Sequence, residues 1–322
     1  MSVGSNIKKR RIELHMSQHE LAITMGYKTR STIAKIEAGE NDVSHKKLQK
    51  FAAVLNTTVD ALISEDAVPV QETAPTPLPA KAKGKCIAII LAGGTSVRTR
   101  QNVPNQFVNI HGKPLIVYSM DAYQHHPSID DIYVVCLKGW ESIVQAYADQ
   151  YSITKLKYLI TAGSSGAESL KIAVDYISNK YSGDDIVFIQ ESTRPLVNLE
   201  TISTLLQACN ERSSATICHA MKEYVQFSTK DNKVSYIDRN AIISIQSPEA
   251  HRLSLLKEVF AKAAKHNLSE SCCTMLLYNL GYDINFVEGN INNIKIAHDE
   301  DIAAFSAMVN PQSNFNRSFF TW

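Results

Sequence analysis

The chain has 322 residues, of which 44% are hydrophobic and 20% are charged, and its formal net charge is +1. This describes soluble globular protein with room for two domains, and the near-zero charge excludes a protein that coats nucleic acid or membranes through a general positive field. No apolar stretch approaches the roughly 18 residues of a membrane span, and MSVGSNIKKRR lacks an apolar leader core, so we expect a cytoplasmic protein without a membrane partner. Six scattered cysteines without C-x-x-C spacing are expected to be reduced core residues.

Residues 1–66 show a pattern of short helices joined by tight turns. Gly26 closes a second helix, and a third helix over TRSTIAKIEAGE places Ile33 and Ile36 on its inward face. A fourth helix after Ser44 and a short fifth helix repeat the apolar spacing. Five short helices with a glycine-bounded turn between the second and third predict an all-α helix-turn-helix domain.

The string MSQHELAITMGYKTRSTIAKIEAGEND resembles the lambda-repressor or Cro-type (XRE) helix-turn-helix family of DNA-binding domains. The resemblance implies that Gln18 contacts phosphate and that the polar face of the third helix reads the major groove. The residues that it assigns to DNA on that helix are Thr29, Arg30, Ser31, Thr32 and Lys35. Because such domains usually bind as dimers, a homodimer is expected. The alternative is a small helical interaction module that no longer binds DNA.

Residues 67–85, AVPVQETAPTPLPAKAKGK, contain four prolines and alternating lysines but no amphipathic period. This composition predicts an extended tether of polyproline type, whose lysines keep the segment solvated. We therefore expect a helix-turn-helix domain over residues 1–66, a linker over residues 67–85 and a second domain over residues 86–322.

The second domain alternates apolar runs with helical patterns. After an opening strand at residues 86–90, the patterns predict strands at residues 132–137, 156–160, 186–190 and 215–220, and helices at residues 115–124, 140–151, 167–180 and 199–210. This alternation predicts an α/β, Rossmann-like domain with a mainly parallel sheet and helices on both faces. Ligands of such sheets bind beyond the carboxyl ends of the strands.

The loops at the strand ends hold the candidate binding residues. The first, LAGGTSVRTRQNVPNQF, follows the opening strand, so Gly93 and Gly94 offer backbone N–H groups to an anion while Arg98 and Arg100 supply charge. An ordinary surface loop is the alternative. The other loops are TAGSSGAES with Gly163 and Ser169, QESTRP with Glu191, and FVEGNINNIKI, which places Lys295 in a short strand before a helix that begins near Asp299.

These loops, in this order, resemble those of the cytidylyltransferases that make CDP-methylerythritol and CDP-ribitol. The motifs that carry the likeness are LAGG-x-x-x-R, P-x-Q-F, G-K-P, the T-R-P turn and N-I-K-I, and the region from Lys138 to Trp140 leans toward the ribitol branch. The resemblance implies a nucleotidyltransferase (GT-A-like) fold that binds CTP and Mg²⁺. In that family a sugar-alcohol phosphate attacks the α-phosphate and pyrophosphate leaves, and catalysis is mostly positioning and charge neutralisation.

The resemblance also assigns roles to individual residues. It gives nucleotide binding to Ala92, Gly93, Gly94, Gly163 and Ser169, phosphate contacts in catalysis to Arg98 and Lys295, and the substrate side to Arg239 and Glu223. Glu191 stands where the family has a metal-binding aspartate, and it either binds Mg²⁺ or caps Thr193 and Arg194 in a turn. The family's transition-state lysine is Asn105 here, and asparagine cannot supply that charge.

Two hypotheses follow from these residues. In the first, the chain is a DNA-binding transcriptional regulator whose cytidylyltransferase-like domain is a degenerate sensor for a nucleotide or CDP-polyol, a pseudoenzyme. In the second, it is an active CTP-dependent cytidylyltransferase for a sugar-alcohol phosphate, with Arg100 as one candidate replacement for the missing lysine. Loss of one preorganised charge costs about a hundredfold to a thousandfold in rate, which favours the first hypothesis.

Overall fold

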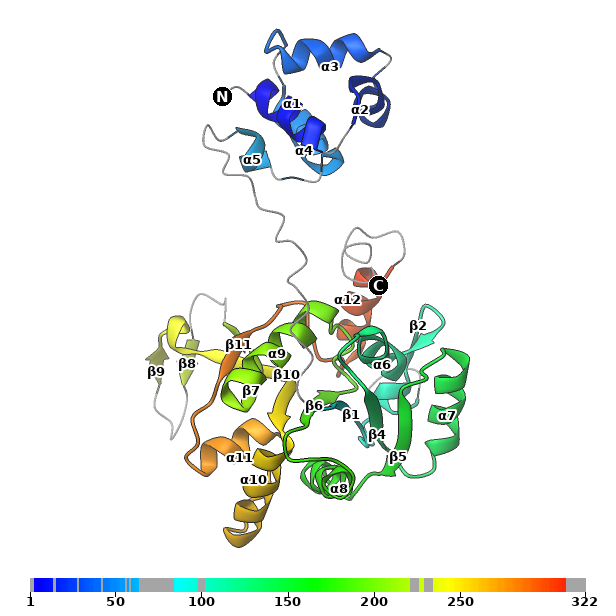
Figure 1. Ribbon diagram of the computed structural model, residues 1–322, viewed down its shortest axis with the longest axis vertical. Helices are drawn as coiled ribbons and strands as arrows, with labels where there is room; N and C mark the ends of the chain where they lie inside the picture. The colour runs from blue at the N-terminus through cyan, green and yellow to red at the C-terminus, as the bar shows by residue number, and fades with distance from the viewer. Residues whose placement is uncertain are drawn as a thin grey trace. The chain divides into compact units, whose positions relative to one another are not determined.

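The computed structural model describes residues 3–13, 16–27, 29–41, 43–55, 57, 59–63, 84–97, 102–220, 226–228 and 234–310. These residues fall into two compact units (Figure 1), one holding the described residues up to 63 and the other those from 84 onward. Each unit is described by itself. Within the described residues, no helix combines the length and apolar character needed to cross a bilayer.

The first unit is a bundle of short helices, as predicted. Its helices are α1 (Val3–Glu13), α2 (Gln18–Met25), α3 (Arg30–Glu37), α4 (His45–Val54) and α5 (Val59–Ile63). Gly26 adopts φ +80° between α2 and α3, a backbone conformation that side chains with a Cβ rarely take, and this allows the sharp turn. The core gathers one apolar face from each helix, with Ile7, Leu21, Ile33, Phe51, Leu55 and Leu62 almost fully buried.

The second unit is built on a seven-stranded, mainly parallel sheet with the order β11-β7-β10-β6-β1-β4-β5. The strands are β1 (Cys86–Ala92), β4 (Asp131–Cys136), β5 (Leu156–Thr161), β6 (Ile186–Glu191), β7 (Ser214–Ala220), β10 (Ile243–Arg252) and β11 (Phe286–Glu288). Of these seven strands, β10 alone runs antiparallel to its neighbours, β6 and β7. The α/β fold class is confirmed, and the predicted strands and helices agree with the structure to within two residues at either end.

Helices cover both faces of this sheet (Figure 1). One face carries α6 (Leu115–His125), α7 (Glu141–Gln150) and α9 (Leu199–Arg212), and the other carries α8 (Gly166–Ser178), α10 (Leu253–Lys265) and α11 (Cys273–Asn279). Strand β1 shows why its sequence is continuously apolar, because Ala88 and Ile90 enter one core while Ile87 and Ile89 enter the other.

Smaller elements complete the second unit. They are the turn η1 (Asn105–Phe107), the pair β2 (Asn109–Ile110) and β3 (Lys113–Pro114), the hairpin of β8 (Gln226–Ser228) and β9 (Ser235–Ile237), the turn η3 (Arg239–Ala241) and the helix α12 (Asp299–Met308). A capping box at His298 and Asp301 starts α12 at the predicted position. A separate apolar cluster joins α12 to α6, and it includes the fully buried Ile296. This cluster fixes the segment that carries Lys295.

Candidate functional site

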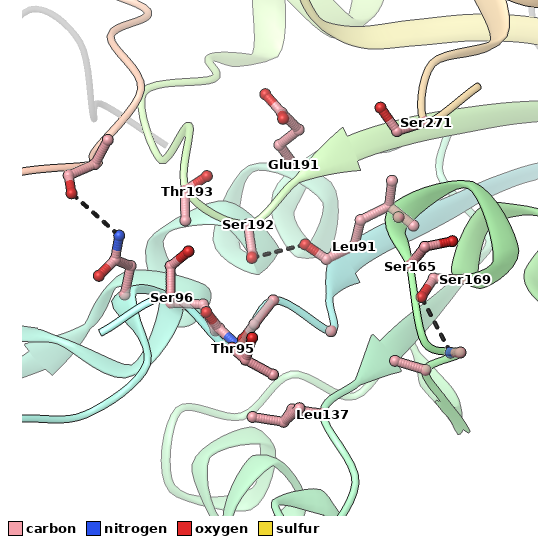
Figure 2. A pocket seen from close by; sticks show the side chains of 18 of the residues that line it. Leu91, Thr95, Ser96, Leu137, Ser165, Ser169, Glu191, Ser192, Thr193 and Ser271 are labelled. Atoms are coloured by element: carbon pink, nitrogen blue, oxygen red, sulfur yellow. Dashed lines mark hydrogen bonds between the residues drawn. The ribbon is translucent and has the colours of Figure 1, made fainter. Parts of the chain in front are cut away.

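The carboxyl ends of β6, β1, β4 and β5 open into a cavity of about 810 Å³. Each of these four neighbouring parallel strands contributes the loop that follows it, because parallel strands all end at the same edge of the sheet. Figure 2 looks into this cavity, with Glu191 and Thr193 on one side, Leu137 on the opposite side, and Ser165 and Ser169 on a third. The volume matches that of small-molecule sites, so the location predicted for the ligand holds a cavity of suitable size.

The loop after β1 contains two glycines that differ in what they allow. A Cβ on Gly93 would lie 2.4 Å from the Cβ of Ala162, so close packing against the loop after β5 requires glycine there. A Cβ on Gly94 would have Gln106 Oε1 at 4.0 Å as its nearest neighbour. Protein packing therefore explains Gly93, whereas the open space at Gly94 leaves its backbone accessible to a ligand.

Gln106 fixes the shape of this loop, although no role was predicted for it. Its Nε2 donates to the carbonyl oxygens of Ala92 at 2.9 Å and Gly94 at 2.8 Å, and the side chain is 2% exposed. Protein groups thus fix the loop, which lowers the ordering cost of binding. The conspicuous P-x-Q-F motif was the available signal, but only the contacts identify the function of its glutamine.

Asn105 lies at the cavity wall and is 5% exposed. Its Nδ2 donates to the carbonyl oxygen of Ala297 at 3.3 Å, and its backbone N–H donates to Ser96 at 3.0 Å. Asn105 therefore connects the loop after β1 to the segment that follows Lys295. A neutral amide that bonds to a carbonyl contributes no positive charge to the cavity.

The loop after β5 is ordered by serine hydroxyls at the start of α8. Ser165 caps the helix by accepting the N–H of Glu168 at 3.1 Å. Ser169 Oγ accepts the N–H of Gly163 at 3.1 Å. Ser164 donates to Glu168 through both its hydroxyl and its N–H, and these bonds lower the pKa of that carboxyl. The start of α8 thus lies at the cavity, where a helix N-terminus favours an anion or a carbonyl oxygen.

Glu191, at the end of β6, is the centre of an ion-pair cluster. One carboxylate oxygen accepts from Arg194 Nε at 2.9 Å, and the other accepts from Lys295 Nζ. The Glu191–Arg194 pair is the turn contact that was one of two alternatives for this glutamate. Mg²⁺ is commonly held by one or two carboxylates together with substrate phosphates, so Glu191 fits as a single protein ligand for that ion.

The position of Lys295 corrects one prediction. The sequence pattern placed it in a strand, but β11 ends at Glu288 and Lys295 lies in the loop that follows. The reason is that β11 pairs with β7 over three residues only, after which the chain crosses to β6. There the N–H of Ile296 donates to the carbonyl oxygen of Thr193 at 2.8 Å. This crossing brings Lys295 to Glu191, 104 residues earlier in the chain.

Five other predicted residues lie apart from the cavity or outside the described residues. Ala92 is buried at the end of β1, where its carbonyl oxygen accepts from Gln106. Arg239 is exposed in η3 and does not line the cavity. Arg98 and Glu223 lie outside the described residues, as does Arg100. The geometry therefore brings Gly93, Gly94, Gly163, Ser169, Asn105, Glu191 and Lys295 together at one cavity.

A buried polar network on β10 lies behind the cavity and was missed in the sequence. Glu249 Oε2 accepts from the N–H and the hydroxyl of Thr274, each at 2.7 Å, and lies 3.3 Å from His251 Nε2. Burial raises the pKa of Glu249, but hydrogen bonds from His251 and Thr274 outweigh it and leave the pKa below its ordinary value. A space of about 170 Å³, lined by Glu249, Glu191 and Lys295 among others, connects this network with the ion-pair cluster.

In the first unit, the structure presents the predicted face of α3 to solvent. Thr29, Arg30, Ser31 and Lys35 are exposed and Thr32 is half-buried, whereas Ile33 and Ile36 are buried as predicted. Gln18 is held within the protein, because its Nε2 donates to Glu37 Oε2 at 2.9 Å. Glu37 also pairs with the buried Arg11 at 2.6 Å, so this cluster ties α1, α2 and α3 together.

Comparisons with known proteins agree with both units. Residues 7–62 match the helix-turn-helix family model, and residues 86–311 match the model described as 2-C-methyl-D-erythritol 4-phosphate cytidylyltransferase. The chain is 33% identical to ribitol-5-phosphate cytidylyltransferase of Lacticaseibacillus paracasei, a match that covers 68% of this chain and 96% of the relative. The enzyme of the same name from Vibrio parahaemolyticus is 30% identical, over 71% of this chain and 97% of the relative.

Solved structures give the same fold. The crystal structure of 4-diphosphocytidyl-2C-methyl-D-erythritol synthase from Anaerococcus prevotii superposes with a TM-score of 0.60 at 19% identity, over 70% of this chain and 97% of that one. At this identity the superposition shows the fold alone. Together with the family match over residues 86–311, it is enough to place the protein: the chain belongs to the 2-C-methyl-D-erythritol 4-phosphate cytidylyltransferase family and carries a helix-turn-helix domain ahead of that fold.

Proposed function

We propose that the chain is a DNA-binding regulator whose cytidylyltransferase-type domain binds CTP or a CDP-activated sugar alcohol as a signal. The observation that carries this proposal is the contrast within one cavity. The glycine loops are shaped for a ligand, whereas the charge expected at position 105 is absent and that of Lys295 is already paired. Asn105 is neutral and hydrogen-bonded, and Lys295 is paired with Glu191.

Ligand binding is supported by groups that recognise a ground state. Three features favour a bound anion: the open backbone at Gly94, the backbone N–H groups at the start of α8, and the loop fixed by Gln106. None of them depends on charge that develops in a transition state. Binding of this kind survives the loss of a catalytic lysine, because the free energy of ligand binding and the extra stabilisation of a transition state are separate quantities.

DNA binding is supported by the exposed polar face of α3. Arg30 and Lys35 are the cations on this face, and such side chains contact guanine edges or phosphates. The buried Arg11–Glu37 pair holds the helices in a fixed arrangement, so the face is preorganised. Residues 67–85 serve in this proposal as the tether between the two domains.

A homodimer is supported by the exposed apolar side chains at the hairpin of β8 and β9. Phe227, Val234 and Tyr236 expose 58%, 72% and 61% of their surface, which is unusual for apolar side chains unless another surface covers them. In a dimer the second domain sets the spacing of two α3 helices. A ligand would change DNA affinity only if it binds differently to two such arrangements.

The alternative is an active cytidylyltransferase acting on a sugar-alcohol phosphate, with the DNA-binding domain attached. It is favoured by the names of the relatives, which are ribitol-5-phosphate cytidylyltransferases, and by the presence of Ser169 and Lys295 at the cavity. In either case Glu191 is the residue that would hold Mg²⁺, whose charge would neutralise phosphate oxygens.

The full-length chain can be used to separate the two functions. CTP and CDP-ribitol are titrated by calorimetry, and pyrophosphate release is measured with CTP, Mg²⁺ and either ribitol 5-phosphate or 2-C-methyl-D-erythritol 4-phosphate. A regulator binds a cytidine ligand, releases pyrophosphate only at background rate, and retards a fragment of its own promoter at low salt. Lys295→Ala should weaken ligand binding alone, and Arg30→Ala should weaken DNA binding alone.

Two outcomes would reject the regulator. Pyrophosphate release above background that Lys295→Ala abolishes would favour the active enzyme. Failure to retard any promoter fragment, with Arg30→Ala indistinguishable from the wild type, would remove the DNA-binding function.

A further inference from the structure

We infer that Lys138, in the loop after β4, is an anion-binding residue of this cavity and supplies positive charge that Asn105 cannot. The inference rests on the proposed binding of a cytidine nucleotide. It concerns a side chain to which the sequence motifs gave no role, although Lys138 lines the cavity.

The sheet order puts Lys138 between the two loops that offer backbone amides. Strand β4 pairs with β1 on one side and with β5 on the other. The loop after β4 therefore lies between the loop containing Gly94 and the loop from Gly163 to Gly166, and all of these residues line the same cavity. A cation at this position lies next to N–H donors on both sides, which is a favourable environment for a polyanion.

The backbone around Lys138 is held rigidly to the end of β1 and to the turn η1. The N–H of Leu137 donates to the carbonyl oxygen of Ala92 at 3.3 Å. Two residues beyond Lys138, the ring of Trp140 stacks on Phe107, with ring centroids 4.1 Å apart and planes 5° from parallel. Phe107 belongs to η1, the same turn that carries Asn105. Binding must therefore order only the lysine side chain, because its backbone is already placed.

Charge pairing distinguishes Lys138 from the other cavity cation. Among the described residues that line the cavity, the cationic side chains are Lys138 and Lys295, and the acidic one is Glu191. Lys295 is paired with that carboxylate, whereas Lys138 forms no ion pair with an acidic side chain within the described residues. An exposed lysine of this kind can move its ammonium group to a phosphate without breaking an existing pair.

The test measures binding of CTP and of inorganic tripolyphosphate to the full-length wild type, Lys138→Ala and Lys138→Arg by calorimetry. Lys138→Ala should lower the affinity for both ligands about tenfold, which is the scale of one charge-assisted hydrogen bond. Lys138→Arg should keep most of the affinity. Lys257→Ala, which removes an exposed lysine from α10, is the matched control and should change neither affinity. Equal melting temperatures of the variants show that each is folded.

The outcomes separate this inference from the proposed function. If Lys138→Ala binds CTP as tightly as the wild type does, the inference about Lys138 is wrong, but the proposed function is unaffected. Weaker binding of CTP with unchanged binding of tripolyphosphate also overturns the inference, because Lys138 would then contact the base or ribose. A wild type that binds neither CTP nor CDP-ribitol overturns the proposed function, and the role of Lys138 falls with it.

Discussion

Replacing Glu191 by glutamine should strengthen CTP binding when no divalent cation is present. The carboxylate now neutralises Lys295, and the exposed fractions of the two side chains are 35% and 48%. Two unit charges 4 Å apart attract by about 1 kcal/mol in water and about 4 kcal/mol at an effective dielectric constant near 20. Because both side chains are partly exposed, the lower energy applies. The Glu191–Lys295 ion pair, which a phosphate must break in order to bind Lys295, therefore contributes about 1 kcal/mol. Removing it corresponds to roughly fivefold tighter binding.

Calorimetric titration with CTP, once in EDTA and once in Mg²⁺, measures this change. If Glu191 is a magnesium ligand, the glutamine variant should gain affinity in EDTA and lose most of the benefit that Mg²⁺ gives the wild type. Glu200→Gln removes an exposed carboxylate at the start of α9 and should behave as the wild type. Unchanged affinity of Glu191→Gln in EDTA would refute the competition between carboxylate and phosphate, and an equal response to Mg²⁺ would exclude Glu191 as a metal ligand.

Two further predictions concern stability and the glycine loop. Burial lowers the pKa of His126 to about 4, so its protonation favours the unfolded chain, and stability that is complete above about pH 6.5 is lost as the pH falls. Urea unfolding followed by tryptophan fluorescence should show that the free energy of unfolding falls by about 2 kcal/mol between about pH 7.5 and 5. This pH dependence should disappear in His126→Asn and remain in His125→Asn. Gly93→Ala should destabilise the fold by about 2 kcal/mol, because its Cβ would clash with Ala162. Gly94→Ala should keep stability and weaken CTP binding, and equal stabilities of the two variants would contradict the packing argument.

The central parallel strands β1, β4 and β6 could be predicted because each of them is buried on both faces. Such strands are short, continuously apolar and bounded by turn residues, as in the run from Cys86 to Ala92. Strand β10 gave no such signal. Its buried stretch contains Glu249 and His251, whose partners come from β7 and from the start of α11. Those partners are distant in sequence, so hydropathy alone could not identify this strand as buried.

The site was predictable where one loop carried the whole signal. The glycines after β1 follow a strand directly, and they lie at the cavity as expected. The pairing of Glu191 with Lys295 was not predictable, because it depends on the chain crossing from β11 to the turn after β6. The flat stack of Trp140 on Phe107 was hidden for the same reason, since it joins loops that follow different strands.

The hydrogen bond of Asn105 and the ion pair of Lys295 are physically connected. Asn105 donates to Ala297, two residues after Lys295, so it helps to hold the segment in which Lys295 meets Glu191. A lysine at position 105 would lose this bond and would add a third cation beside Lys295 and Arg194. In the network as it stands, one carboxylate, that of Glu191, pairs with both cations, an arrangement that suits a stable binding site. Because residues of a catalytic unit act together, a lysine placed alone at position 105 would not by itself create the charge distribution that a transition state requires.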